Sequence, residues 1–477
     1  MGNACSCNCA GVQEKTVKVY GMPPSQNCVG PILLAMELQV GGMEFLNLME
    51  GAHKKPEYLA INPSGKVPGL QDGEVKIGES MAILRFLAMR YGQRYYPISN
   101  PASCYQIDMA MDAFSKVYNT HIKVVYPVMG FGAPPPDQPG ANKAYGEEIA
   151  KWFQHHVRGR FVLGDKVSIA DFKAIPFFFA AVQPGVKHKC GFTPASRLEK
   201  YVQDVVGAIN ASGFMKSAGG YSIAEFIASK VEGKPVAATP VVEIGGPCAR
   251  SIGAAGVKGQ VKIHGMPASM NCVGPIMLAM ESKAGAMQLV DAMGGALKQP
   301  DYLAINPHGQ MPGLEDGTVK GGESLAVLRY LALQYDRRFY PAADPAITAV
   351  IDYAMDDFCS TVYEAHCGVV YPVFGFTSMP DDKAAASRAY EEAMNKWALA
   401  HLKKGKYVAG SILSIADFKA VPFFFAAVQP GVVNKMGLKV PQRIATYVED
   451  FCKEIGASGF MKSAGGYSLA EFAAKNA

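Results

Sequence analysis

Residues 62–70 read Asn62-Pro-Ser-Gly-Lys-Val-Pro-Gly-Leu70, and Gly78-Glu79-Ser80 follows after a hairpin signal at Asp72-Gly73. The segment that opens with Tyr58-Leu-Ala-Ile-Asn-Pro63 returns in the second half of the chain as Tyr302-Leu-Ala-Ile-Asn-Pro307, and most residues after it match as well. A repeat of this length indicates duplicated domains and not a solenoid, whose units are only about 20–50 residues long.

Each copy of the repeat joins a mixed strand and helix pattern to a long helical one. Thr16–Tyr20 alternates like a half-buried strand, and a helix is expected to begin near Pro31, which suits a first helical position. A second strand is expected over Met43–Leu48, and Ser80 is placed to cap another helix. After Pro97 the pattern turns helical to the end of the copy.

We therefore predict an α/β domain plus an all-α domain, a pair that occurs twice. Copy 1 denotes residues 16–230 and copy 2 denotes residues 259–477. The predicted divisions are a leader at 1–15, an α/β domain at 16–96, a helical domain at 97–230, a linker at 231–258, a second α/β domain at 259–340 and a second helical domain at 341–477. The linker is rich in Gly, Ala, Pro and Val without a helical or strand period, and its length lets the two copies pack together.

The segments Asn62–Leu70 and Gly78–Ser80 resemble the glutathione-binding core of the cytosolic glutathione transferases. Ser168-Ile-Ala-Asp171, which returns in copy 2, resembles the N-capping box of that family's central buried helix. The resemblance covers about Thr16 to Phe226 and about Gln260 to Phe472. It implies that each copy is a thioredoxin-like domain followed by the family's helical domain, with glutathione as co-substrate and no metal.

The resemblance also implies which residues bind glutathione, a tripeptide with two carboxylates, an amine and a thiol. An extended peptide binds well along an exposed strand edge, where the residue before a cis-proline gives main-chain contacts. A helix N-terminus suits a carboxylate. The implied glutathione-binding residues are His53, Lys66, Val67, Pro68, Glu79 and Ser80 in copy 1, and Gln310, Met311, Pro312, Glu323 and Ser324 in copy 2.

The chemistry of this family needs a thiolate, because a free thiol with a pKa of about 8.5 is mostly protonated at neutral pH. Ser25 resembles the activating serine of the theta and delta classes, and Ser269 is its counterpart in copy 2. The alternative for each is a loop serine that caps the next helix. Cys28 and Cys272 are expected to be buried by packing, with mixed disulfides as the alternative, and Tyr20 is a weaker candidate activator.

Both copies depart from the family at the first helix, and copy 2 departs further. Val29-Gly30-Pro31 follows Cys28, where many relatives carry Arg or Lys. His53 resembles a delta-class glutathione contact but becomes Leu297, and Lys66, which resembles a glycine-carboxylate contact, becomes Gln310. Copy 1 is therefore expected to bind glutathione more strongly, and copy 2 to be weaker or silent.

The first long helix of each helical domain is expected to line the pocket for the second substrate. Its large apolar side chains predict an apolar electrophile, although an aromatic stripe at helical spacing also suits a core. The candidate residues are Tyr118, Tyr126, Met129 and Phe131 in copy 1, and Tyr363, Tyr371, Phe374 and Phe376 in copy 2.

The N-terminal sequence Met1-Gly2-Asn3-Ala4-Cys5-Ser6 fits the N-myristoylation pattern, with Gly2 as the acceptor. One myristoyl chain gives only marginal membrane binding, so stable anchoring needs a second signal. Cys5, Cys7 and Cys9 are candidates for S-palmitoylation. We predict a lipid-anchored protein on the cytoplasmic face of a membrane, and the alternative is an unmodified leader.

The composition argues against several other classes of protein. A hydrophobic fraction of 49% and a charged fraction of 18% are typical of globular domains. The net charge of +5, without a long run of Lys and Arg, gives no indication of nucleic-acid binding. No apolar stretch is long enough for a transmembrane helix, and the cysteines beyond the leader lack metal-ligand spacing, so we expect reduced thiols.

Two functions fit these observations. The first is transfer of glutathione to apolar electrophiles, or reduction of lipid peroxides, at a membrane; retention of Ser25, Val67-Pro68 and Glu79-Ser80 favours it. The second is a non-catalytic scaffold or interaction module, because a fold alone does not fix function. The altered first helix and the divergence of copy 2 favour the second. The two copies are expected to pair as an intramolecular pseudo-dimer, with a homodimer of chains as the alternative.

Overall fold

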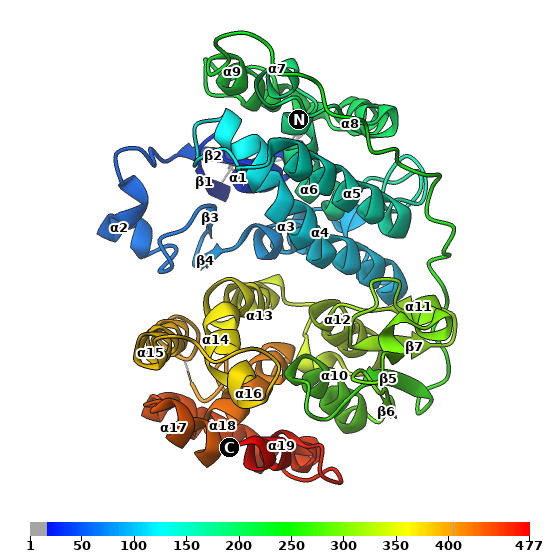
Figure 1. Cartoon of the computed structure of the whole chain (residues 1–477), viewed down its shortest axis with the longest axis vertical. Helices are drawn as coiled ribbons and strands as arrows, with labels where there is room; N and C mark the ends of the chain where they lie inside the picture. The colour runs from blue at the N-terminus through cyan, green and yellow to red at the C-terminus, as the bar shows by residue number, and fades with distance from the viewer. Residues whose placement is uncertain (1–16, 404) are drawn as a thin grey trace, which may run out of the picture.

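The computed structural model describes residues 17–403 and 405–477. Within them the chain forms two similar halves, with copy 1 in the upper half of Figure 1 and copy 2 in the lower half. Each half contains a four-stranded sheet with its helices, followed by a helical part. The predicted fold, an α/β domain and a helical domain that occur twice, is confirmed.

The two sheets have the same topology. In copy 1 the strand order is β2-β1-β3-β4, with β1 parallel to β2 and antiparallel to β3, and in copy 2 it is β6-β5-β7-β8. The elements of the first α/β part are β1 (Val17–Gly21), α1 (Gln26–Glu37), β2 (Gly41–Phe45), η1 (Ala52–Lys54), α2 (Pro56–Leu59), β3 (Gly69–Asp72), β4 (Val75–Gly78), α3 (Ser80–Tyr91) and η2 (Gln93–Tyr95). Those of the second are β5 (Val261–Gly265), α10 (Met270–Glu281), β6 (Gly285–Leu289), η4 (Ala296–Lys298), α11 (Pro300–Ile305), β7 (Gly313–Asp316), β8 (Val319–Gly321), α12 (Ser324–Tyr335) and η5 (Arg337–Phe339).

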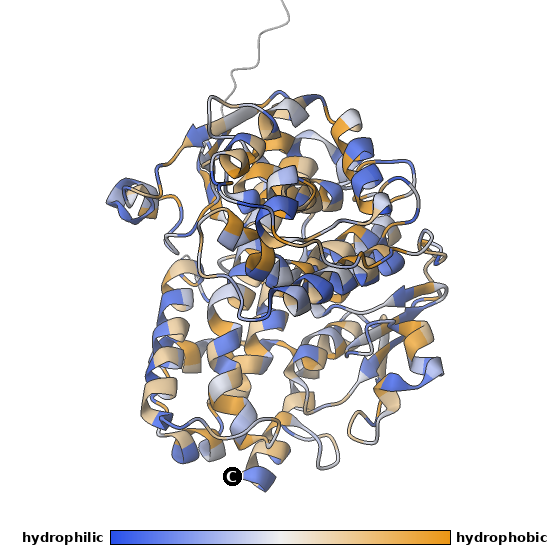
Figure 2. Cartoon of the chain, turned by 45° about the horizontal axis from the view of Figure 1, so that its top comes forward, coloured by the Kyte–Doolittle hydropathy of each residue, from blue (hydrophilic) through white to orange (hydrophobic). Residues whose placement is uncertain are grey.

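The helical parts surround a central apolar helix in each copy. In copy 1 they comprise α4 (Pro101–Val128), α5 (Gln138–His156), α6 (Ile169–Ala181), α7 (Pro184–Cys190), α8 (Ser196–Ala208), η3 (Asn210–Met215) and α9 (Ile223–Ala228). In copy 2 they comprise α13 (Pro345–Asp357), the π-helix η6 (Phe358–Val362), α14 (Tyr363–Val373), α15 (Lys383–His401), α16 (Ile415–Ala427), α17 (Pro430–Met436), α18 (Gln442–Glu454), η7 (Gly456–Met461) and α19 (Leu469–Asn476). Figure 2 shows hydrophobic residues gathered on the inward sides of these helices.

The central helix α6 begins with the predicted capping box. The Asp171 carboxylate accepts hydrogen bonds from the Ser168 backbone N–H and hydroxyl, both at 2.8 Å, and from Tyr201 at 2.8 Å. Ser414 and Asp417 repeat the capping box in α16. Because these groups are buried, the capping box satisfies polar atoms that would otherwise be costly inside the core.

Two boundaries differ from the sequence prediction. Helix α1 begins at Gln26 and not near Pro31, because Ser25 occupies the N-cap position and the helix continues through the proline. Pro31 removes one backbone donor from the helix but leaves the rest of the ladder in place. The second strand spans Gly41–Phe45 and not Met43–Leu48, because β1 pairs with the residues that directly follow the turn after α1.

The sequence Val29-Gly30-Pro31 is explained by close packing between α1 and α6. Val29 is fully buried, and a Cβ atom added at Gly30 would clash with the carbonyl oxygen of Phe172 in α6. Gly274 meets Phe418 in the same way in copy 2. A long charged side chain at the position of Val29 would therefore lie in a dry helix contact.

Replacing Gly30 with alanine is expected to lower the free energy of unfolding by about 1–3 kcal/mol, because the added methyl group forces α1 away from α6. Gly207 in α8 is the matched control, since nothing lies within 4 Å of a Cβ atom added there. Gly207→Ala should instead stabilise the protein by up to about 1 kcal/mol, the ordinary helix-propensity gain. Equal effects of the two substitutions in chemical denaturation would contradict close α1–α6 packing.

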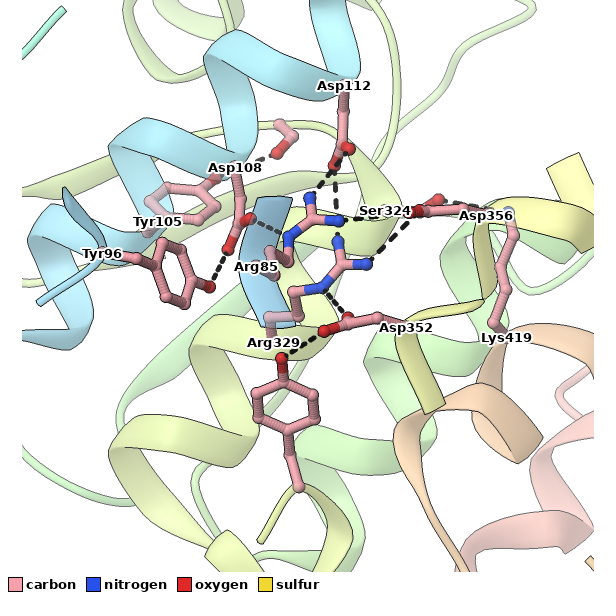
Figure 3. Close-up of polar contacts among 12 residues, drawn as sticks. Arg85, Tyr96, Tyr105, Asp108, Asp112, Ser324, Arg329, Asp352, Asp356 and Lys419 are labelled. Atoms are coloured by element: carbon pink, nitrogen blue, oxygen red, sulfur yellow. Dashed lines mark hydrogen bonds and ion pairs between the residues drawn. The ribbon is translucent and has the colours of Figure 1, made fainter. Parts of the chain in front are cut away.

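The two copies meet through α3 and α4 of copy 1 and α12 and α13 of copy 2. A buried cluster of charges lies at this junction (Figure 3). Arg85 binds Asp108 of its own copy at 2.8 Å and Asp356 of copy 2 at 3.3 Å, and it lies 3.5 Å from Asp112. Its counterpart Arg329 binds Asp352 at 2.7 Å and Asp356 at 3.4 Å, and it lies 3.9 Å from Asp112. The junction therefore pairs the two copies within one chain by near-symmetrical contacts.

The segment between α9 and β5 connects the copies and is bound along their surfaces. Near its start, Val236 N–H donates to His188 O at 2.9 Å in copy 1. Near its end, Gly256 N–H donates to an Asp316 carboxylate oxygen at 2.7 Å in copy 2. This route, visible at the right of Figure 1, is long enough to place α12 and α13 against α3 and α4.

Candidate functional site

The candidate glutathione site of each copy lies at the starts of two helices of its α/β domain, α1 and α3 in copy 1 and α10 and α12 in copy 2. Site 1 denotes Ser25, Val67, Pro68, Glu79 and Ser80, and site 2 denotes Ser269, Met311, Pro312, Glu323 and Ser324. The peptide bonds Val67–Pro68 and Met311–Pro312 are both cis, as the resemblance implied. They directly precede β3 and β7, the strands that pair with β1 and β5.

Glu79 and Glu323 stand at the starts of α3 and α12 in an unusual backbone conformation. Both have φ of 62°, in the left-handed region that costs a non-glycine residue about 1–3 kcal/mol. Each glutamate occupies the N-cap position, so Ser80 is the first residue of its helix and not the predicted cap. The turn presents the backbone N–H groups of the helix start next to the serine hydroxyl, an arrangement that suits an anion.

A lysine from the helical domain, which the sequence reasoning missed, joins this helix start. Lys173 of α6 donates from Nζ to Asn27 Oδ1 at 2.8 Å and to Ser80 Oγ at 2.9 Å, so it connects the starts of α1 and α3. Burial lowers the pKa of Lys173 to about 8. Lys419 repeats both contacts in copy 2, at 2.8 Å to Asn271 and 3.3 Å to Ser324. The sequence contained a signal for this lysine, because beyond the capping-box aspartate it is the one charged residue of an apolar helix in both copies.

Ser25 is the N-cap residue of α1, but its side chain does not cap the helix. Its Oγ instead accepts a hydrogen bond from Cys28 Sγ at 3.2 Å. A hydroxyl that accepts in this way keeps its own hydrogen for another acceptor. Ser269 likewise makes no side-chain cap on α10. Both serines therefore stand at the N-cap position, as the alternative expects, but neither side chain makes a capping hydrogen bond.

Cys28 and Cys272 are core residues, as expected from the sequence. Both are fully buried, and burial raises the pKa of each thiol to about 11. The thiols therefore stay protonated at neutral pH and donate to the neighbouring serine instead of acting as nucleophiles. Tyr20, the weaker candidate activator, donates to Gln71 on the neighbouring strand at 3.2 Å.

The other predicted glutathione contacts lie on loops beside the sites. His53 lies in η1, and its Nδ1 is buried without a hydrogen-bond partner among the described residues. Lys66 and Gln310 are exposed, and each contacts the opposite copy: Lys66 Nζ donates to Ser360, and Gln310 Oε1 accepts from Lys116 at 2.8 Å. These inter-copy contacts were beyond the reach of the sequence reasoning.

The predicted second-substrate residues divide into core and half-buried groups. Met129 and Phe374 are 1% and 2% exposed, so they belong to the core. Tyr118 and Tyr126 are half-buried and in edge contact with one another, while Phe131 is exposed. In copy 2, Tyr363 and Tyr371 are half-buried with their hydroxyls 3.4 Å apart, and Phe376 stacks on Phe472.

The lipidation candidates Gly2, Cys5, Cys7 and Cys9 lie outside the described residues. Among the residues that the structure describes, no helix combines the length and apolar character needed to cross a membrane. Within the same residues, no group of three or more His, Cys, Asp or Glu side chains is arranged to hold a metal ion.

Comparisons with known proteins place the chain among a set of relatives. A family model described as the N-terminal domain of glutathione S-transferase matches residues 15–89. Glutathione S-transferase 3 of Zea mays is 31% identical over 172 residues, which cover 32% of this chain and 73% of the relative. Glutathione S-transferase F9 of Arabidopsis thaliana is 30% identical over 184 residues, which cover 35% of this chain and 82% of the relative.

Two solved structures illustrate the range of structural similarity. Bombyx mori glutathione transferase BmGSTD1 shares 22% sequence identity with a TM-score of 0.39, and the alignment covers 46% of this chain and 98% of that one. Leishmania TDR1, described as a unique trimeric glutathione transferase, shares 15% identity with a TM-score of 0.37, and the alignment covers 97% of this chain and all of that one.

Proposed function

The chain belongs to the glutathione S-transferase family, and we propose that it binds reduced glutathione and activates its thiol for attack on apolar electrophiles. The observation that carries the proposal is the pair of helix starts held together by one lysine. Lys173 joins α1, which carries Ser25 at its N-cap, to α3, which carries Ser80 at its first residue. A thiol activator and a carboxylate site are thereby fixed relative to each other.

The proposed binding mode follows from these groups. The γ-glutamyl carboxylate binds at the start of α3, where backbone N–H groups, the Ser80 hydroxyl and the nearby Lys173 ammonium favour negative charge. The cysteinyl backbone pairs with Val67, which precedes the cis-proline. The glutathione sulfur then lies near the start of α1, where the helix dipole and the Ser25 hydroxyl stabilise a thiolate.

The proposed reaction is a direct displacement or addition. The thiol proton passes to solvent, the thiolate lone pair forms the new carbon–sulfur bond, and a leaving group departs with the electrons of its own bond. With a lipid hydroperoxide, two glutathione molecules supply the electrons, and the products are glutathione disulfide, an alcohol and water. Half-buried Tyr118 and Tyr126 provide an apolar surface for the second substrate.

Calorimetric titration of reduced glutathione into the unacylated protein tests the proposal. Saturable binding is expected, and Ser80→Ala should weaken binding at site 1 at least about tenfold, because it removes a hydroxyl from a charged ligand. Ser103→Ala is a suitable control, since Ser103 is a buried serine near the start of another helix, α4. No saturable binding at millimolar glutathione would reject the enzyme proposal and favour the scaffold alternative.

We further propose that the protein is held on the cytoplasmic face of a membrane by acyl groups on Gly2 and on one or more of Cys5, Cys7 and Cys9. The support is the myristoylation pattern with clustered cysteines directly after it. Gly2→Ala should move the protein from the membrane fraction to the soluble fraction of cells that express it. Cys248 lies far from the leader in the sequence, so Cys248→Ala should leave the partitioning unchanged. The same distribution for the unmodified protein, Gly2→Ala and Cys248→Ala would refute the lipid anchor.

A further inference from the structure

At each site the two copies contact each other through a lysine side chain. At site 1 the lysine is on a loop of the copy that contains the site, and at site 2 it is on a helix of the other copy. At site 1, Lys66 of copy 1 donates from Nζ to the carbonyl and hydroxyl oxygens of Ser360 in copy 2, at 3.2 and 3.3 Å. At site 2 the loop residue is Gln310, and its Oε1 accepts from Lys116 of copy 1 at 2.8 Å. Lys116 and Ser360 follow the matching residues Phe114 and Phe358 by the same number of positions. Each contact therefore contains one ammonium group.

A local difference in helix geometry accompanies this difference in the position of the lysine. Phe358 and Tyr363 of copy 2 match Phe114 and Tyr118 of copy 1, and the segment between them is one residue longer in copy 2. The π-helix η6 accommodates that residue, whereas α4 continues through the same region as an α-helix. A π-turn displaces backbone carbonyls from their α-helical partners, and Lys66 donates to one such carbonyl, that of Ser360. Copy 1 keeps the regular helix and carries the lysine on it.

Both ammonium groups lie near the glutamate at the helix start. Ser360, which accepts from Lys66, also donates to Glu79 Oε1 at 2.7 Å. Burial raises the pKa of Glu323, and the charge of nearby Lys116 opposes that rise. Lys116 and Gln310 also line a cavity of about 380 Å³ between the copies, together with His155, His308 and Lys151. The Lys116 side chain therefore faces a cavity that also borders Gln310, the residue directly before Met311 of site 2.

We propose that Lys116 of copy 1 is part of the glutathione site of copy 2, where it supplies the cation that Lys66 supplies to site 1. This inference rests on the proposed function. A glutathione carboxylate takes the place of the Gln310 amide oxygen as the acceptor, because an ammonium group binds a negatively charged carboxylate more strongly than a neutral amide oxygen. The positive charge that Gln310 lacks in comparison with Lys66 is supplied from the other copy, so the expectation that site 2 is weak or silent no longer follows.

The test is glutathione titration in the Ser80→Ala background, where the remaining strong binding is that of site 2. Lys116→Ser, which installs the residue that copy 2 carries, should weaken site 2 about tenfold and reduce the dependence of its affinity on ionic strength. Lys123→Ser is the matched control, because Lys123 is an exposed lysine on the same helix, and it should leave site 2 unchanged. In an otherwise unmodified chain, Lys116→Ser should leave site 1 unchanged.

A rescue variant makes the test specific. Lys116→Ser combined with Gln310→Lys reproduces the side-chain pair of site 1 and should return the affinity of site 2 to within about threefold of its starting value. Undiminished binding in Lys116→Ser, or an unmodified chain whose only binding is removed by Ser80→Ala, would overturn this inference while leaving the proposed function standing. An unmodified chain that binds no glutathione at all would instead remove the proposed function itself.

Discussion

Replacing Arg85 with leucine is expected to lower the free energy of unfolding by about 3–5 kcal/mol, the range for breaking a buried ion pair by removing one partner. The Arg85 side chain is 0% exposed and contacts carboxylates of both copies (Figure 3). Leucine occupies similar space but leaves Arg329 as the remaining arginine of the cluster, paired with Asp112 and Asp356, and Asp108 loses its arginine contact. Chemical denaturation of the full chain measures the change, and Arg329→Leu should behave alike.

The cost of Arg85→Leu should also depend on pH. Burial already raises the pKa of Asp112 to about 7, so the folded state holds its proton more tightly than the unfolded state, where the pKa is about 4. A raised folded-state pKa gives stability that is present at low pH and is lost as the pH rises through that pKa. Loss of Arg85 raises the carboxyl pKa values further, so the substitution should cost less at about pH 5.5 than at about pH 8.

Arg338→Leu provides the comparison for this prediction. Arg338 also binds an aspartate, but its side chain is 75% exposed, so its loss should change stability by less than about 1 kcal/mol at either pH. If the two substitutions had similar effects, the junction between the copies would depend on apolar contacts and not on the buried charges. A larger loss of unfolding free energy for Arg85→Leu at low pH than at high pH would contradict the predicted pH dependence.

The sequence predicted local features where a short motif determines its own geometry. The strand–hairpin–helix order depends on residues close together in the chain. The family resemblance implied the cis bonds at Pro68 and Pro312 and the capping box at Ser168. The start of α1 was misplaced because proline has a strong preference for a first helical turn, yet packing of Gly30 against α6 holds the helix through it. Tertiary contact there overrode local propensity.

The contacts between the copies were not predictable from one sequence. Lys66 and Ser360 are 294 residues apart, and Lys116 and Gln310 are 194 apart. Neither pair follows a spacing rule, because each joins a loop of one copy to a helix of the other. The comparison of copies showed only that Lys66 becomes Gln310, which implied a lost charge. Only the three-dimensional arrangement shows where a second lysine stands.

Replacing Ser25 with alanine is expected to lower kcat/KM for transfer of glutathione to an activated aryl chloride by about 10²–10³-fold, measured in the Ser269→Ala background so that site 1 alone is observed. The hydroxyl stabilises charge on sulfur, and little of that charge is present when the neutral thiol binds. Glutathione affinity should therefore change by less than about threefold. The pKa of the bound thiol, followed by its thiolate absorbance, should rise toward the free value of about 8.5.

Two further variants separate the Ser25 hydroxyl from the thiol that contacts it. Ser25→Thr keeps a donor at the start of α1 and should retain most of the rate, and the pH at which the rate is half-maximal should stay near that of the unmodified site. Cys28→Ala removes the hydrogen bond that Ser25 accepts at 3.2 Å, so the hydroxyl loses orientation but not its ability to donate. We expect a loss of about tenfold or less for it, well short of Ser25→Ala. Full activity in Ser25→Ala would remove Ser25 from the mechanism, and the dipole of α1 would then be left as the feature of site 1 that stabilises the thiolate.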